Sequence, residues 1–136
     1  MYTTDSTQAW FARYSAAARK LEILQKRLAV AEAKAQKPER LEILRQDIAK
    51  AREAASNVYS EIDGVIQHLD DKERTLIDAR YLGEEKWRDI NNLLFGEKPN
   101  FGQREKSYLR TTFFLHTRAI QKITDILNDQ ADKTEE

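Results

Sequence analysis

Residues 21–44 decide the fold, and they read LEILQKRLAVAEAKAQKPERLEIL. Large apolar residues recur here at steps of three and four, which is the spacing of the apolar seam of a coiled coil. The phase of the repeat changes at Pro38, because an unbroken seam would need apolar residues at positions 38, 42 and 45, whereas the sequence has them at 41, 44 and 48. Proline is well tolerated at the first position of a helix. We therefore predict two helices that meet just before Pro38.

Outward from this stretch, the same repeat extends through both predicted helices. Folding the chain back near Gln36 pairs seven residues of one seam with seven of the other, and the two residue numbers of each pair add up to 72, as for Leu24 and Ile48. One register therefore satisfies both seams, which predicts a long antiparallel helical hairpin over residues 1–69. The seam residues are Trp10, Tyr14, Ala17, Leu21, Leu24, Leu28, Ala31, Ala35, Leu41, Leu44, Ile48, Ala51, Ala55, Val58, Ile62, Val65 and Leu69.

Five apolar residues of the predicted hairpin lie off its seam: Ile23, Val30, Ile43, Tyr59 and Ile66. They could face a second copy of the chain or the C-terminal half. They could also be ordinary exposed apolar residues, which are common on protein surfaces. We expect self-association, with a homodimer as the simplest form.

From Asp70 onward the coiled-coil spacing gives way to shorter helical segments. Asp70 and Glu73 have the spacing of a capping box at the start of a helix, and Gly83 offers its C-terminal stop. A short helix should then run from about Glu84 to Gly96. Its expected apolar face consists of Trp87, Ile90, Asn91 and Leu94.

The last predicted helix runs from about Arg104 to Asn128, after a loop over residues 95–106. Its expected inward stripe consists of Leu109, Phe113, His116, Ile120, Ile123 and Leu127. Residues 129–136 are expected to form a flexible acidic tail. The predicted fold is thus all-α, with the hairpin followed by a three-helix helix-turn-helix domain over residues 70–128.

The composition supports long helices and excludes several classes of protein. Among 136 residues, 34% are charged and 40% hydrophobic, with only four Gly and two Pro to form turns. The chain has no Cys, which excludes disulfides and cysteine-based zinc sites. No apolar run approaches the roughly 20 residues that cross a bilayer, and the first residues do not resemble a secretory signal. We expect a cytoplasmic protein.

The charge is unevenly distributed although its formal sum is zero. Residues 98–122 contain a single acidic residue, Glu105, and six basic ones: Lys98, Arg104, Lys106, Arg110, Arg118 and Lys122. Such a local excess can attract phosphate even when the whole molecule is neutral. The alternative is a solvated charged helix face, which is the usual meaning of a charge run.

A helix-turn-helix with a basic last helix is the arrangement in which that helix enters the major groove of DNA. Thr111 and Thr112 lie with Arg110, Arg118 and Lys122 away from the expected apolar stripe or at its border. Arg104 and Lys106 precede them, in a position suited to phosphates. Lys86, at the start of the short helix, could add a phosphate contact.

Residues 70–126 resemble a known family. The order Asp70-Asp71-Lys-Glu73-Arg74, then Arg80-Tyr81-Leu82, then Trp87-Arg-Asp-Ile90 is similar to the opening of sigma-factor region four. It is closer still to phage and prophage regulators of the ArpU and RinA type, whose closing helix has an aromatic, Leu-His and a basic residue, as in residues 113–120. The resemblance implies a sequence-specific transcriptional regulator in a bacterial host cell, with double-stranded DNA as its partner and RNA polymerase as a candidate second one.

The resemblance also implies roles for individual residues. Arg110, Thr111 and Thr112 occupy the positions of base contacts, and Arg118 and Lys122 those of backbone contacts. Two features depart from the family. Asn91 replaces the small residue that usually follows the Ile of the short helix, which puts close helix packing in doubt. The loop over residues 95–106 exceeds the usual turn, which puts the approach of the last helix to DNA in doubt.

An enzymatic function is not expected. His68 and His116 lie on or beside apolar helix faces, where a packed histidine is more common than a catalytic one. The adjacent carboxylates at 70–71 and at 84–85 point about 100° apart along a helix, so neither pair converges as an acid and a base. No phosphate-binding glycine motif is present, and no cofactor or metal is expected. Two alternatives stay open: a structural interaction protein that acts through the hairpin, and a DNA-packaging subunit similar to small terminases.

Overall fold

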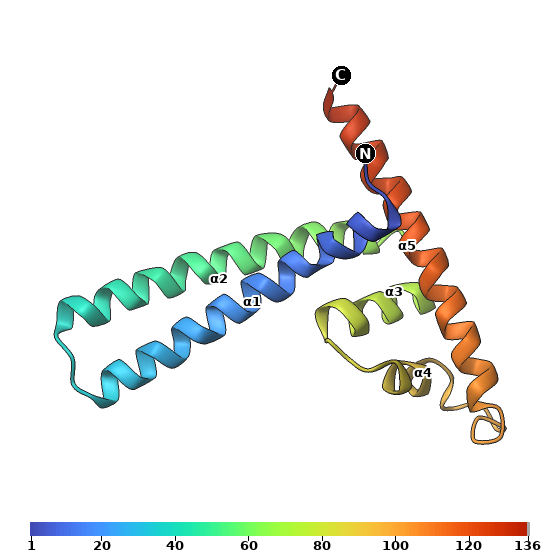
Figure 1. Ribbon diagram of the computed structural model, residues 1–136, viewed down its shortest axis with the longest axis horizontal. Coiled ribbons are helices and arrows are strands. Elements are labelled where there is room, and N and C mark those ends of the chain that lie inside the picture. Colours follow the sequence, from blue (N-terminus) through green and yellow to red (C-terminus); the bar gives the residue numbers. More distant parts are fainter. Residues whose placement is uncertain (136) are drawn as a thin grey trace. The chain divides into compact units, whose positions relative to one another are not determined.

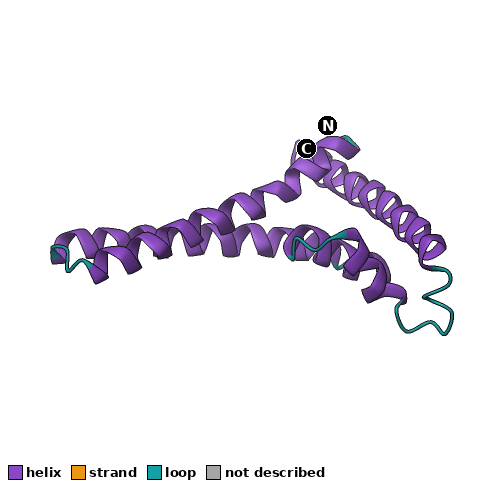
Figure 2. Cartoon of the chain, turned by 60° about the horizontal axis from the view of Figure 1, so that its bottom comes forward, coloured by secondary structure: helices purple, strands orange, loops and turns teal. Residues whose placement is uncertain are grey.

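The computed structural model describes residues 1–135, and this part of the chain contains helices and no strand (Figures 1 and 2). The prediction of an all-α fold is confirmed. None of the described helices is both long enough and apolar enough to span a bilayer. The elements are α1 (Thr4–Ala33), α2 (Pro38–Ile66), α3 (Asp71–Ile77), a short π-helical segment η1 (Asp78–Leu82), α4 (Trp87–Phe95) and α5 (Glu105–Glu135).

The chain divides into two compact units, and the boundary differs from the one after residue 69 that the sequence suggested. One unit is Ala12–Ile62, and the other combines Met1–Phe11 with the chain from Asp63 onward. The first residues of α1 belong to the second unit because they contact α5. Thr7 Oγ1 lies 2.7 Å from Thr124 Oγ1, and Tyr2 N donates to Asn128 Oδ1.

The unit of residues 12–62 is the predicted antiparallel hairpin, with α1 and α2 side by side (Figure 1). Leu24, Ile48 and Ala51 form its buried cluster, and Leu21 and Leu28 pack against them. These residues include two of the predicted pairs, Leu24 with Ile48 and Leu21 with Ala51, so the predicted register is confirmed. Ion pairs bridge the two helices on the surface, from Arg45 to Glu32 at 3.6 Å and from Arg13 to Glu61 at 2.7 Å.

The turn of the hairpin lies just before Pro38, which is the first residue of α2. Ala35 adopts a left-handed conformation with φ of 49°, and the backbone N–H of Gln36 donates to the carbonyl of Ala31. The prediction of Ala35 as a seam residue is therefore wrong, because α1 ends at Ala33 and Ala35 serves the chain reversal.

Of the five apolar residues expected off the seam, Ile23, Val30, Ile43 and Tyr59 are exposed. Ile66 is buried, which agrees with the alternative that a residue off the seam faces the C-terminal half. It lies in the second unit, at the end of α2, together with the buried Val65 and Leu69.

The second unit contains α3, η1, α4 and α5. Asp70 is the N-cap of α3, and its backbone N donates to Glu73 Oε1 at 3.2 Å, so the predicted capping box is confirmed. The helical segment ends at Gly83 as predicted, although Gly83 itself keeps a right-handed conformation. The left-handed residue is Glu84, with φ of 52°. Since the chain turns there, α4 begins at Trp87 and not near Glu84.

Gly96 ends α4, as the sequence predicted. A Cβ atom at this position would clash with the carbonyl oxygen of Asn92, so the backbone at the end of α4 requires glycine here. The N–H of Gly96 donates to that same carbonyl at 2.7 Å.

Helix α5 differs from its prediction in length and in phase. It continues to Glu135, so the described residues of the expected flexible tail are helical. The buried stripe includes the expected Ile120, Ile123 and Leu127 together with Ala119. Phe113, expected inside, is exposed, whereas its neighbour Thr112 is buried. The first half of α5 is therefore rotated relative to the predicted stripe.

Candidate nucleic-acid interface

The start of α5 is attached to α4 through a buried amide. Asn91 Nδ2 donates to the backbone carbonyl of Glu105 at 3.2 Å, and Thr112 Oγ1 donates to Asn91 Oδ1 at 2.9 Å. Buried polar groups are stable in a core only when they are hydrogen-bonded, and both Asn91 groups are. Asn91 therefore joins the two helices of the predicted helix-turn-helix, although its replacement of a small residue had put close packing of these helices in doubt.

The long loop between α4 and α5 is held by aromatic rings. Tyr108, in the second turn of α5, stacks on Phe95 at 5.0 Å and on Phe101 at 5.9 Å between ring centroids. Its hydroxyl donates to Asn100 Oδ1 at 3.1 Å. Because the end of α4 and the loop both pack against the same ring, the extra loop residues do not detach α5 from α4.

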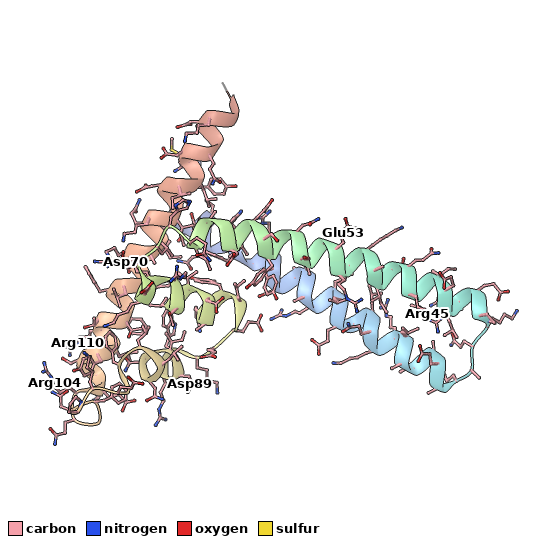
Figure 3. All side chains as sticks on the ribbon, turned by 180° about the vertical axis from the view of Figure 1, so that it is seen from behind. Arg45, Glu53, Asp70, Asp89, Arg104 and Arg110 are labelled. Carbon is pink, nitrogen blue, oxygen red and sulfur yellow. The ribbon has the colours of Figure 1, made fainter. Side chains whose placement is uncertain are left out.

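Three of the predicted basic residues gather at the start of α5. Arg104, Lys106 and Arg110 line one hollow of about 430 Å³, whose lining also contains the acidic Glu105 and the polar Gln103 and Ser107. Lys106 and Arg110 lie one helical turn apart on the same face. Figure 3 shows Arg104 and Arg110 at this end of the helix.

These three cations are exposed and available to a ligand. Within residues 1–135, Arg104, Lys106 and Arg110 form no ion pair with a carboxylate. We name them the α5-start cations. Thr111 is exposed beside Arg110, and its hydroxyl donates to the carbonyl of Ser107 at 3.3 Å.

Two further predicted site residues are exposed but do not line this hollow. Lys98 lies in the loop before α5 and forms no ion pair among the described residues. Lys86 is the N-cap residue of α4 and lines a separate hollow of about 530 Å³ with Arg88 and Asp89. Arg88 lies 3.8 Å from Glu105, which partly neutralises it.

Arg118 and Lys122, expected to contact the DNA backbone, have side chains that are 44% and 40% exposed, and both are paired with carboxylates at the start of α3. Arg118 Nε lies 3.0 Å from Glu73 Oε2, and Lys122 Nζ lies 2.8 Å from Glu73 Oε1. Both cations also approach Asp70 Oδ2, at 3.1 Å and 3.6 Å. These four residues, which we name the α3–α5 ion cluster, join the start of α3 to the middle of α5. Figure 3 marks Asp70 there.

The ion cluster has a distinct electrostatic character because the side chain of Glu73 is fully buried. Burial raises the pKa of Glu73, but hydrogen bonds from Lys122, Arg118 and the backbone of Asp70 outweigh it, so the pKa lies below its ordinary value. The hydrogen bond to Glu73 likewise raises the pKa of Lys122. Both groups are thus ionised near neutral pH, and their charges offset each other.

Thr112, expected to contact bases, is buried and therefore cannot reach a DNA base in this conformation. Its side chain is fully buried and its hydroxyl is bound to Asn91. Of the nine predicted DNA-binding residues, the structure thus leaves six on the surface without a carboxylate partner among the described residues. They are Lys86, Lys98, Arg104, Lys106, Arg110 and Thr111.

An aromatic cluster supports the middle of α5 from the other side. Trp87 is half-buried and contacts Phe113 and His116 edge-on, and the guanidinium of Arg80 lies 4.7 Å above its ring. His116 Nε2 lies 2.7 Å from the hydroxyl of Tyr81. Burial, with a smaller contribution from the charge of Arg80, lowers the pKa of His116. His116 is therefore a packed, hydrogen-bonded histidine, as the sequence favoured. His68 is exposed.

Several residues of this surface were not predicted from the sequence. Gln103 and Ser107 line the hollow of the α5-start cations, and their place one helical turn before Lys106 and Arg110 was a usable signal. Phe114 is the most exposed aromatic residue of the described chain, at 63%. Its position outside the predicted inward stripe of the last helix was a usable signal.

No protein-family model, curated protein or solved structure matches this chain. The residues that the structure describes contain no group of three or more potential metal-ligating side chains. The geometry of the α5-start cations and of the α3–α5 ion cluster therefore provides the basis for assigning a function.

Proposed function

We propose that this protein is a sequence-specific DNA-binding transcriptional regulator of the phage and prophage type, which inserts the first turns of α5 into the major groove. The observation that carries the proposal is the group of exposed, unpaired cations Arg104, Lys106 and Arg110 on the helix that follows α4. Two short helices and a longer basic one, joined as here, match the order of a helix-turn-helix.

Helix electrostatics support a ligand role for these cations. The N-terminus of a helix carries a partial positive charge, so Lys106 in the first turn of α5 is placed where a cation slightly destabilises the helix. Stability alone therefore does not account for a basic residue here. A phosphate group would be attracted by both the helix terminus and the side chains.

Size and exposed chemistry also fit a DNA groove. A helix of about 10–12 Å diameter fits the major groove, which is about 12 Å wide. Arginine can bind guanine through two hydrogen bonds, which suits Arg110 in the second turn, and Arg104 in the preceding loop suits a phosphate. Homodimer formation and contact with RNA polymerase stay predictions.

The proposal is tested by fluorescence anisotropy with duplex DNA from the region flanking the protein's own gene, over a salt series. Replacing Arg104, Lys106 and Arg110 together with alanine should abolish specific binding. The salt dependence should flatten by about 0.9 units of log–log slope for each phosphate that the variant no longer neutralises. The matched control replaces three exposed cations of the hairpin, Lys34, Lys37 and Arg52, with alanine. Equal reductions in affinity for both variants, or no reduction for the first, would contradict the proposal.

A further inference from the structure

One side of the hairpin carries a groove that the DNA-binding proposal does not use. Two hollows lie between α1 and α2 within residues 12–62, of about 480 Å³ and 510 Å³. Their linings are related by seven residues: Ala31, Arg27 and Leu44 in the first correspond to Leu24, Lys20 and Ala51 in the second. Because a heptad step returns to the same side of a coiled coil, both hollows belong to one side. We call it the hairpin groove.

The rim of the hairpin groove presents large apolar side chains to solvent. Ile23 and Val30 line the first hollow and are 51% and 52% exposed. Ile43 is equally exposed, and it lies seven residues before Lys50, which lines the second hollow. Three half-exposed β-branched residues therefore share this side. Such a grouped apolar surface marks an interaction site more often than scattered apolar residues do.

The charges along the hairpin groove are almost all positive. Its lining contains one acidic residue, Asp47, and five basic ones: Lys20, Lys26, Arg27, Arg40 and Lys50. Lys26 is paired with Glu22 at 3.0 Å. Arg27 and Arg40 form no ion pair among the described residues, and both flank the first hollow beside the apolar floor of Ala31 and Leu44.

This charge distinguishes between the possible occupants of the groove. In a symmetric dimer the same patch faces itself, so a second copy would bring the cations of both grooves together. Like charges placed opposite each other disfavour an interface, whereas opposite charges select the partner and accelerate its encounter. The groove therefore disfavours the self-association that its exposed apolar residues alone would suggest.

We infer that the hairpin groove binds an amphipathic helix of a protein partner, with an apolar stripe flanked by Asp and Glu. The stripe would pack on Ile23, Val30 and Ile43, and the carboxylates would meet Arg27 and Arg40. This is helix-in-groove recognition, in which apolar anchors recur at i, i+3, i+4 and i+7. The lining extends from Ala17 to Ala31 along α1, which corresponds to about 20 Å, or roughly four turns of a bound helix.

The test uses the full chain and a fluorescent helical peptide of about 21 residues, ~30 Å long. The peptide has leucines at steps of three and four, flanked by glutamates. Anisotropy should show saturable binding that weakens with salt, and a peptide with lysine in place of glutamate should not bind. Arg27→Glu with Arg40→Glu should weaken binding about tenfold, since two favourable rim pairs become repulsive.

A matched control separates the groove from general charge. Arg52 is exposed and lies one residue after Ala51, on the other side of the hairpin, so Arg52→Glu should change peptide affinity less than about twofold. Ile23→Ser with Val30→Ser should also abolish binding, while circular dichroism keeps its helical signal because both residues are half-exposed. Equal effects of the Arg27/Arg40 and Arg52 changes would overturn the inference.

Two further results would overturn it. Sedimentation could show a dimer that the Arg27/Arg40 double variant converts to a monomer, which would make the groove a self-interface. Random-sequence duplex DNA could displace the peptide, which would make the groove part of a nucleic-acid surface. The inference does not depend on the DNA-binding proposal, because the groove variants leave the α5-start cations intact.

Discussion

Arg110 and Arg118 lie eight residues apart on the same helix, but their surroundings in the structure differ. Arg110 lines an open hollow and has no carboxylate partner among the described residues. Arg118 binds the buried carboxylate of Glu73 and the exposed one of Asp70. The difference comes from α3, which brings its acidic first turn to the middle of α5 but not to its start. The number of basic residues in a stretch of sequence thus overstates the positive charge at the surface, because acidic residues from elsewhere in the chain pair with some of them.

The largest expected effect is on stability, through the α3–α5 ion cluster. Glu73→Gln keeps the size of the side chain but removes the charge that binds both Arg118 and Lys122. We expect the free energy of unfolding to fall by about 2–3 kcal/mol, a figure that already allows for the partial exposure of the two cations. Urea unfolding followed by circular dichroism measures it.

An exposed pair on the same helix provides the control for this prediction. Asp71 and Arg74 are 2.7 Å apart, and the side chain of Asp71 is 93% exposed, so Asp71→Asn should cost less than ~1 kcal/mol. The effect of Glu73→Gln should also depend on pH. Because the folded pKa of Glu73 lies below 4.5, its contribution is complete above that pH and declines as the pH falls below it. Equal costs for the two substitutions would show that burial does not matter here.

The second prediction concerns DNA binding and contrasts the two arginines directly. Arg110→Ala should weaken binding to a specific duplex by about 1–3 kcal/mol and relax its specificity. Arg118→Ala should change DNA affinity by less than about twofold, because the guanidinium of Arg118 is hydrogen-bonded to Glu73. The affinity is measured under conditions in which circular dichroism shows that the variant is folded. A larger decrease in affinity for Arg118→Ala than for Arg110→Ala would reverse the comparison.

The third prediction applies the same contrast to two neighbouring threonines. Thr112→Val leaves Asn91 Oδ1 without its donor, which should lower the free energy of unfolding by about 1 kcal/mol without changing the DNA affinity of the folded protein. Thr111→Val at the exposed neighbour should change stability by less than ~0.5 kcal/mol. A decrease in DNA affinity for Thr112→Val at full helicity would return Thr112 to the interface.

The smallest expected effect is a pH dependence near neutrality that arises from His116. Burial lowers its folded pKa below 6.5, so the unfolded chain takes up the proton first as the pH falls. The free energy of unfolding should therefore decrease as the pH is lowered through 6.5 towards the folded pKa. His116→Gln should flatten this segment of the stability profile. An unchanged slope would assign the dependence to another group.

The hairpin was the part of the fold most completely predictable from the sequence. A heptad repeat is a local property, and two repeats joined by a short turn allow only the register in which both seams face each other. Leu24, Ile48 and Ala51 accordingly form the buried cluster. Capping at Asp70 and the helix stop at Gly96 were predictable for the same reason, since backbone groups within one turn determine them.

The candidate site was only partly determined by the sequence. Residue types and spacing identified the basic helix and its exposed arginines, but not the rotation of its first half. In the structure Thr112 is buried and bound to Asn91, whereas Phe113 is exposed. Only the tertiary structure decided which cations are paired, because Glu73 and Lys122 are 49 residues apart in the chain and meet only through the packing of α3 on α5. The spacing of apolar residues indicates which face of a helix is buried, whereas an ion pair between helices depends on which second helix packs against the first.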